Sequence, residues 1–202
     1  DLEVEQREQE GSLWHIKYPI DKDKFIVVAT TRPETMLGDT AVAVHPEDNR
    51  YKNYIGLYCI LPLVQRRIKI IADEYADPDK GSGAVKITPA HDFNDFEIGK
   101  KNNLEFINIF DQHANLNDTV PDRFKGKDRY EARDDILKEL KSLDLLIKEE
   151  KQLMVVPYGD RSGVVIEPWL TDQWFCDAKK LSLDPIKAVK KGETKFVPIQ
   201  WE

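Results

Sequence analysis

The sequence has little cysteine, no long apolar run and no surplus of basic residues, and each shortage argues against a class of protein. Two of its 202 residues are cysteines, Cys59 and Cys176, and neither has a cysteine or histidine companion at metal-ligand spacing. We therefore expect two reduced thiols, each packed as a small apolar group, and not a disulfide framework. No apolar run approaches the ~20 residues of a membrane span, so no membrane partner is expected. The start shows no basic and apolar leader, which favours a cytoplasmic location over secretion.

Acidic residues outnumber basic ones. The 37 Asp and Glu residues against 30 Lys and Arg residues give a formal net charge of −7. This is the wrong sign for a protein that coats nucleic acid by neutralising phosphates, although a domain that touches only the end of a nucleic acid needs few such contacts. A hydrophobic share of 41% and a charged share of 33% describe a globular chain that is long enough to bury a sizeable core.

Short strands and a few helices follow one another in mixed order. Trp14, Ile16 and Tyr18 alternate with polar residues as in a half-buried strand. Further strands are predicted at 25–29, 41–44, 57–61, 68–71, 84–88, 106–110, 164–167 and 170–175. Helices are predicted for about a turn and a half after 32, at 94–101, at 129–143, and from 184 to 192. Because alternating βα units are not seen, the pattern indicates an α+β fold with a closed or nearly closed β core.

Chemically versatile side chains concentrate in two segments, 30–35 and 81–95, where strands give way to a turn or helix. The first segment offers Thr31, Arg32 and Thr35. In the second, Lys86 and Thr88 share one face of a strand, opposite the apolar face of its neighbours. Asp92 and Asp95 follow at the start of the next helix. The chemistry favoured by these residues is binding of an ammonium or a hydroxyl by carboxylates, and polarisation of a carbonyl by fixed cations.

Each of these residues also has a purely structural interpretation. Lys86 can be a solvated lysine, Asp92 with Asp95 imitates a capping box, and Arg32 can simply pair with a carboxylate. His91 with the nearby carboxylates raises the possibility of a metal, but three or four ligands are needed and the other histidines show no ligand spacing. No Ser/His/Asp triad or nucleophile elbow is present, so water is the expected nucleophile.

These two segments, together with 160–168 and 170–175, closely resemble the editing domain of the valyl-tRNA synthetase family, within the class I aminoacyl-tRNA synthetases. The resemblance runs almost end to end. It implies a β-barrel-like fold with peripheral helices, and hydrolysis of threonine wrongly attached to tRNA(Val), with threonyl-adenylate as a second substrate. It also implies that residues 1–202 are one editing domain excised from a longer synthetase chain.

The resemblance assigns roles to matching positions. It implies that Asp95 holds the α-ammonium of the substrate and that Asp92 recognises the threonine hydroxyl. The residues expected to be catalytic are Arg32, Lys86 and Asp95, and those expected to bind substrate are Thr31, Thr35, Thr88 and Asp92. No metal or cofactor is expected for editing, and ATP and Mg²⁺ only for the full-length ligase. The expected partners are the aminoacylated 3′ end of tRNA(Val) and the rest of the synthetase chain.

Three other readings stay open. An isoleucyl-type editing domain would clear valyl-tRNA(Ile), but Glu34 and the segment 88–92 favour the valine family. A passive module would bind tRNA 3′ ends without chemistry, and a metallohydrolase would need a bound metal. The family usually has threonine at Ser82 and methionine at Trp169, departures that lie outside the expected site. The signatures of amino-acid activation are absent, so this chain is not expected to make an aminoacyl-adenylate.

Overall fold

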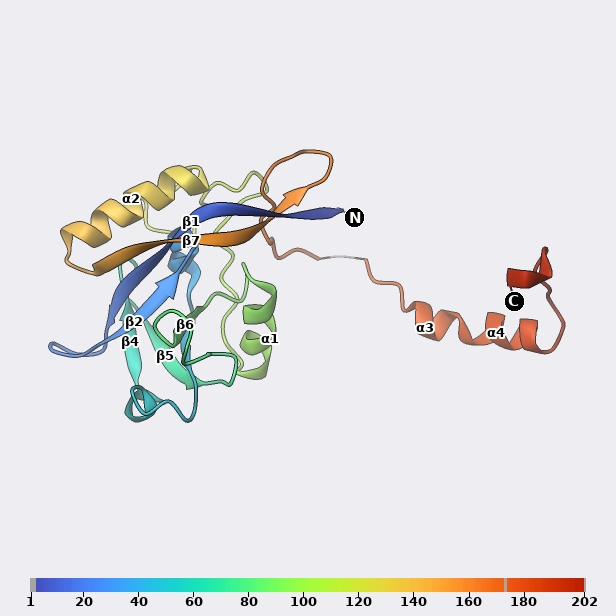
Figure 1. Ribbon diagram of the computed structural model, residues 1–202, viewed down its shortest axis with the longest axis horizontal. Coiled ribbons are helices and arrows are strands. Elements are labelled where there is room, and N and C mark those ends of the chain that lie inside the picture. The colour runs from blue at the N-terminus through green and yellow to red at the C-terminus, as the bar shows by residue number, and fades with distance from the viewer. Residues whose placement is uncertain (1–2, 173, 202) are drawn as a thin grey trace. The chain divides into compact units, whose positions relative to one another are not determined.

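The computed structural model describes residues 3–172 and 174–201, which form two compact units, Asp1–Leu170 and Thr171–Glu202. The first unit contains two sheets and two α-helices (Figure 1). The second unit contains α3 (Ala178–Leu181), α4 (Leu183–Lys190) and the short 3-10 helix η3 (Ile199–Trp201). The expectation that residues 1–202 make one editing domain stays a prediction.

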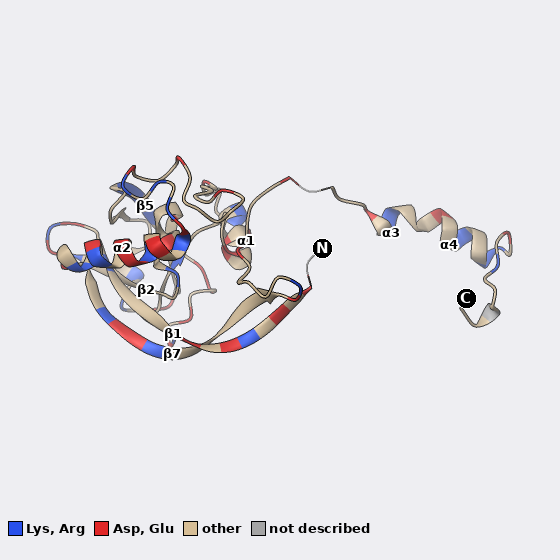
Figure 2. Ribbon diagram, turned by 90° about the horizontal axis from the view of Figure 1, so that it is seen from above, with Lys and Arg blue, Asp and Glu red and all other residues tan. Residues whose placement is uncertain are grey.

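The first sheet has three antiparallel strands in the order β2–β1–β7. They are β1 (Val4–Pro19), β2 (Phe25–Thr30) and β7 (Leu146–Gly159). The second half of β1 pairs with β2, from Trp14 opposite Thr30 to Pro19 opposite Phe25. The first half pairs with β7 alone, so that the two strands continue as a curved ribbon that carries charges of both signs (Figure 2).

The second sheet has four strands in the order β4–β5–β3–β6, and β3 and β5 are its parallel pair. Its strands are β3 (Ala41–Val44), β4 (Tyr58–Leu61), β5 (Arg66–Ala72) and β6 (Ala84–Ile87). Two 3-10 helices precede strands of this sheet, namely η1 (Pro33–Gly38) and η2 (Lys52–Tyr54). All four residues of β3 are fully buried because this strand is central and covered on both faces.

The main hydrophobic core lies between the two sheets and under helix α2 (Arg129–Ser142). This helix packs against η1 and β7 through Ala132, Ile136 and Leu140, which form its buried stripe. Asp128 caps it by accepting a hydrogen bond from the Tyr130 amide. The second helix, α1 (Phe93–Lys101), lies beside β6 (Figure 1).

The prediction of a closed or nearly closed, barrel-like β core is wrong. The strands form two open sheets, and β2 contacts β6 without a ladder of hydrogen bonds joining the sheets. The α+β class itself is confirmed. The sheets stay open because, among the described residues, no ladder of hydrogen bonds joins their edge strands, β2 and β7 in the first sheet and β4 and β6 in the second.

Local predictions succeed where periodicity is strong and fail where pairing is non-local. The strands near 25–29, 41–44, 57–61, 68–71 and 84–88 and the helices near 94–101, 129–143 and 184–192 are confirmed within a few residues. The predicted strand 106–110 is wrong, and 164–167 contains only the isolated Val165–Tyr158 bridge. The segment 170–175 has no strand among its described residues, and Gln173 lies outside them. The charged strand β7 was not predicted at all.

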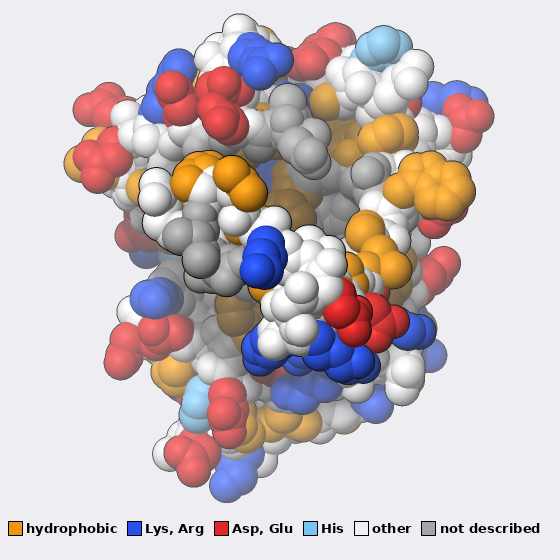
Figure 3. Space-filling view, turned by 90° about the vertical axis from the view of Figure 1, so that its right-hand side faces the viewer, with side chains coloured by type: hydrophobic (Ala, Val, Ile, Leu, Met, Phe, Trp, Pro, Cys, Tyr) orange, Lys and Arg blue, Asp and Glu red, His pale blue; other side chains and the backbone are white. Residues whose placement is uncertain are grey.

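The exposure of the cysteines and the distribution of surface charge bear on two further predictions. Cys59 is buried as expected, whereas Cys176 is exposed, so its predicted packing is wrong. Acidic and basic side chains are interspersed on the face drawn in Figure 3, in keeping with a chain that does not coat a polyanion. Among the helices of the described residues, none combines the length and apolar character needed to cross a membrane.

Candidate functional site

The end of β2 and the strand β6 approach each other closely. At the turn before β6, Gly81 has φ +57°, and a Cβ there would lie only 2.9 Å from the Cβ of Ala29 on β2. A glycine is therefore required both by the backbone conformation and by the close approach. This contact brings the loop after β2 next to the polar face of β6, although the two segments lie about fifty residues apart in the sequence.

A pocket of about 210 Å³ opens at this junction, and we call it the Asp95 pocket. All seven predicted site residues line it: Thr31, Arg32, Thr35, Lys86, Thr88, Asp92 and Asp95. Its other lining residues include Leu13, Tyr75 and His91. The sequence therefore predicted which side chains gather, and the roles given to them stay predictions.

Lys86 is neither solvated nor free. It is 9% exposed, and its Nζ donates to Asp39 Oδ1 at 3.2 Å and to Thr88 Oγ1. Asp39 is fully buried and also accepts from Thr88 Oγ1 at 2.6 Å and from the Tyr18 hydroxyl at 2.7 Å. Burial raises the pKa of Asp39, while Lys86 and the hydroxyls counteract that rise. One of the three N–H groups of Lys86 is left for a ligand in the pocket.

Asp95 is the buried acid of the pocket. It is 5% exposed and accepts one hydrogen bond, from the Thr88 amide to its Oδ2 at 2.8 Å. Burial raises the pKa of its carboxyl to about 6, against the opposing effects of Lys86 and the Thr88 amide. Within the part of the chain that the structure describes, Asp95 Oδ1 has no donor, so this oxygen can accept from a ligand.

Asp92 caps helix α1, which confirms the structural interpretation of this residue. Its Oδ1 accepts from the amides of Asn94 at 2.8 Å and Asp95 at 3.2 Å. The capping role leaves the second carboxylate oxygen of Asp92, which has no hydrogen-bond donor among residues 3–172 and 174–201, available at the pocket. Capping and ligand recognition by Asp92 are therefore compatible.

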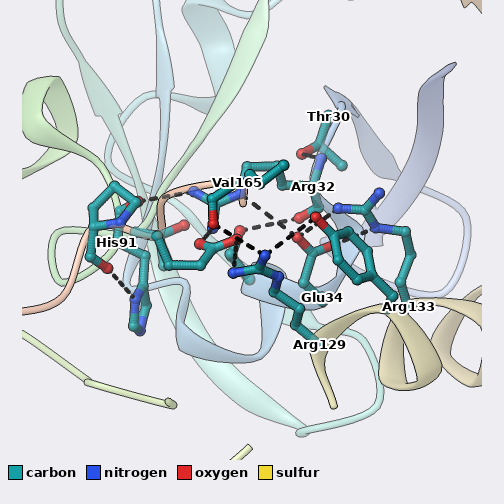
Figure 4. A network of polar contacts seen from close by, with 12 residues as sticks. Thr30, Arg32, Glu34, His91, Arg129, Arg133 and Val165 are labelled. Atoms are coloured by element: carbon teal, nitrogen blue, oxygen red, sulfur yellow. Dashed lines mark hydrogen bonds and ion pairs between the residues drawn. The ribbon is translucent and has the colours of Figure 1, made fainter. Parts of the chain in front are cut away.

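Arg32 belongs to a charged network that joins three arginines, Arg32, Arg129 and Arg133, to two glutamates, Glu34 and Glu167. Figure 4 shows how Arg32, Arg129, Arg133 and Glu34 lie within it. It donates to the His91 carbonyl at 3.0 Å and to Glu167, and lies 3.5 Å from Glu34. Three of its five N–H groups are thus directed to the protein, and two are left. The predicted alternative, pairing of Arg32 with a carboxylate, is confirmed.

The other two arginines come from helix α2. Arg133 makes a two-pronged bond to the fully buried Glu34, at 2.7 and 2.8 Å. Arg129 pairs with Glu167 at 3.2 Å, and its Nε is buried with no hydrogen-bond acceptor among the described residues. Three positive charges against two negative ones leave the network with one uncompensated positive charge, in a chain whose net charge is negative.

The threonines of the first segment order its backbone. The hydroxyl of Thr30 accepts from the Arg32 amide at 3.0 Å, and that of Thr35 donates to the Arg32 carbonyl at 3.0 Å. Pro33 at the start of η1 fixes the local φ. These bonds hold the Arg32 backbone in place, so that its guanidinium is directed to the pocket wall.

His91 has a structural role, because its ring contacts two other segments of the chain. Its Nε2 accepts from the Ile109 amide at 3.0 Å, and its Nδ1 lies 3.4 Å from the Pro168 carbonyl. Burial lowers the pKa of the imidazole to about 4, so the ring is neutral at physiological pH. Because the lone pair of Nε2 is taken by an amide and Nδ1 carries the proton, neither nitrogen is presented to a metal.

Several functional neighbours were missed from sequence. Asp39, Glu34, Glu167, Arg129 and Arg133 hold the site residues but were assigned no role. Asp39 had a signal, since it is an acid two residues before a wholly apolar strand, where a buried carboxylate needs a partner. Glu167 lies within the segment 160–168, which had carried part of the resemblance. Arg129 and Arg133 lie on the polar side of a helical pattern and gave no signal.

Comparisons with known proteins bear on the fold and the family of this chain. A family model described as the leucyl-tRNA synthetase editing domain matches residues 51–125. The LeuRS of Agrobacterium radiobacter K84, crystallised in a ternary complex with tRNA and LeuAMS, has a TM-score of 0.51 and 23% identity over 73% of this chain and 20% of that chain. At that identity the likeness shows a shared fold.

Curated relatives match the whole chain. The valine–tRNA ligase of Pelagibacter ubique is 54% identical over 202 residues, 100% of this chain and 23% of that protein. Those of Caulobacter vibrioides and Francisella tularensis are 55% and 53% identical, again over 100% of this chain and over 25% and 22% of those proteins. The chain thus spans about a quarter of the length of these relatives. It belongs to the valyl-tRNA synthetase family and corresponds to the editing-domain region of that family.

Proposed function

We propose that the Asp95 pocket hydrolyses the ester that joins threonine to the 3′ end of tRNA(Val), and that it also accepts threonyl-adenylate. The observation that carries the proposal is the convergence of a buried carboxylate, a second carboxylate and two cations on one small pocket. Its 210 Å³ is below the range of about 300–1,000 Å³ typical of pockets for drug-sized ligands, which favours a group as small as an amino acid.

In this proposal Asp95 holds the substrate through its α-ammonium. Asp95 lines the pocket, its Oδ1 has no hydrogen-bond donor among the described residues, and the carboxyl is predominantly ionised above pH 6. A charge-assisted hydrogen bond from an ammonium to this buried oxygen is stronger than a neutral one. Fixing one end of the substrate places its ester carbonyl at a defined point of the pocket.

The remaining N–H groups of Arg32 and Lys86 polarise that carbonyl. Both side chains are held by carboxylates, Arg32 by Glu34 and Glu167 and Lys86 by Asp39, so their geometry is preorganised before the substrate enters. Fixed donors directed at an oxygen that becomes negative stabilise the tetrahedral intermediate. Water is the proposed nucleophile, and neither a metal nor a cofactor takes part.

Selectivity for threonine over valine is assigned to Asp92. Threonine and valine are nearly isosteric, so a hydrophobic pocket separates them poorly, whereas a site that hydrogen-bonds the hydroxyl rejects the analogue that lacks it. The free oxygen of Asp92 can accept from a threonine hydroxyl. Valine in the same place would leave that carboxylate oxygen desolvated and unpaired, at a cost of about 1–3 kcal/mol.

The test compares release of amino acid from threonyl-tRNA(Val), valyl-tRNA(Val) and valyl-tRNA(Ile), each incubated with this chain. We expect release of threonine alone, and no change on addition of a chelator when a short aminoacylated 3′-end mimic replaces the tRNA. Clearance of valyl-tRNA(Ile) would instead support an isoleucyl-type editing domain. Binding without release of any amino acid would refute hydrolysis and support a passive module, and loss of activity on chelation would support a metallohydrolase.

A further inference from the structure

A second pocket adjoins the Asp95 pocket on the other side of the Arg32 side chain. Its volume is about 360 Å³, and Thr31 and Arg32 line both pockets. The other walls come from the ribbon of β1 and β7 and from helix α2, and they include Trp14, Tyr130, Arg133 and Lys151. We call it the Arg133 pocket. A ligand bound in the first pocket can therefore extend into the second past Thr31 and Arg32, which the two pockets share.

The charges of the Arg133 pocket favour an anion. Its lining contains three cations, Arg32, Arg133 and Lys151, against two carboxylates, Glu10 and Glu167, and Lys151 also pairs with Glu149 at 3.0 Å. Arg133 uses its Nε and Nη2 on Glu34, while its Nη1 has no partner among the described residues. Three of the five N–H groups of this preorganised guanidinium, two on Nη1 and one on Nη2, thus remain for a ligand.

The same pocket offers a surface for a flat group. The guanidinium of Arg133 lies 5.8 Å from the ring centre of Trp14 and 5.1 Å from that of Tyr130. Trp14 is 9% exposed, whereas Tyr130 is 42% exposed, and the guanidinium of Arg129 also lies 4.7 Å from the Tyr130 ring centre. An exposed aromatic ring beside a cation is the combination on which nucleobases stack while their phosphates are neutralised.

We propose that the Arg133 pocket binds a nucleotide of the single-stranded 3′ end of the substrate tRNA, with its phosphate at Arg133 and Lys151 and its base against Tyr130. This inference rests on the proposed function, because it concerns the same substrate, and adds the part of the substrate that lies beyond the ester. The negative net charge of the chain fits, since one or two phosphates are contacted and the body of the tRNA is not.

Lys151 is the residue to change, because its side chain is 80% exposed and its loss leaves no buried charge unpaired. The matched control is Lys148→Glu, the same charge reversal on the same strand at a residue that does not line the pocket. Arg133 is unsuitable because its removal would leave the buried carboxylate of Glu34 without its two-pronged partner and so destabilise the fold. The substrates are the threonyl ester of adenosine, which has no phosphate, and the threonyl ester of the trinucleotide CCA.

With Lys151→Glu we expect the preference for the trinucleotide ester over the adenosine ester, taken as the ratio of the two kcat/KM values, to fall roughly tenfold at low salt. The Lys148→Glu control should lower it much less. An NMR titration with unacylated CCA should move the amide signals of Ser12 and Tyr130 in the wild type and require higher CCA concentrations in Lys151→Glu. Equal effects of the two variants would overturn the nucleotide site and attribute the change to overall charge.

The two proposals can fail separately. If the wild type hydrolyses both esters and Lys151→Glu behaves like Lys148→Glu, editing stands and the Arg133 pocket does not bind the nucleotide. If CCA binds with the expected dependence on Lys151 but neither ester is hydrolysed, the nucleotide site stands and the proposed hydrolysis is refuted. A failure of CCA to shift any residue of the Arg133 pocket, combined with normal hydrolysis, also overturns the site.

Discussion

The burial of Asp95 predicts that this carboxylate costs stability at the pH where it is ionised. The pKa of its carboxyl is raised from 3.8 to about 6, chiefly by desolvation. Between these values the folded chain binds more protons than the unfolded chain, so the free energy of unfolding falls as pH rises through this window. A difference of roughly two pKa units corresponds to about 3 kcal/mol, lost by about pH 7 and retained below about pH 4.

Asp95→Asn removes the charge and keeps the shape. The amide oxygen of asparagine can still accept from the Thr88 amide, whose bond to Asp95 is 2.8 Å long. We expect this variant to be more stable than the wild type by at most about 3 kcal/mol at pH 7.5 and to match it near pH 4. Since 1 kcal/mol moves the Tm of a chain of this size by about 2–4 °C, the gain at pH 7.5 is on the order of 5–10 °C.

The measurement is the Tm of both proteins from pH 4 to pH 8, together with hydrolysis of threonyl-tRNA(Val). Asp134→Asn, at an exposed position of α2, is the control for the loss of one negative charge. The asparagine variant should have lost hydrolysis, because its neutral amide cannot form an ion pair with the α-ammonium, and the wild-type kcat/KM should fall as pH drops through about 6. A stability difference that is independent of pH, or a variant that still hydrolyses, would refute this assignment of Asp95.

Three further outcomes are expected. Asp92→Ala removes an N-cap and should cost about 1 kcal/mol, whereas Asp92→Asn keeps the cap and should lose only the threonine-over-valine preference; equal stability of the two by denaturant titration would contradict the capping role. Lys86→Met alone leaves the buried Asp39 without its cation and should lower the free energy of unfolding by about 3–5 kcal/mol. The double variant Lys86→Met/Asp39→Asn should regain most of that stability but not hydrolysis. A single variant as stable as the wild type would show that the pair is not buried in solution. Finally, a thiol reagent should modify Cys176 and spare Cys59 in the folded chain, because Cys59 is buried and its pKa is raised to about 12; two reactive thiols without denaturant would contradict the burial.

The contents of the Asp95 pocket were determined by the sequence to an unusual degree. Three local features, Pro33, Gly81 and the capping pattern at Asp92, determine the backbone conformation of the few residues around them. They place polar side chains at ends of strands and at the start of a helix, and these ends all lie at one pocket. For the same reason the strongly periodic helix 129–143 and the apolar strands were predictable.

Long-range pairing was decided by the tertiary structure alone. Strand β7 is a charged segment with no strand periodicity, and it is extended because β1, more than a hundred residues earlier, supplies its hydrogen-bond partners. The sheets are open where a barrel had been expected, because hydrogen bonding between edge strands is likewise decided by the assembled fold. Likewise the partners of Lys86 and Arg32 could not be assigned from sequence, because burial decides whether a lysine or arginine is solvated or needs a carboxylate, and burial is a property of the assembled fold.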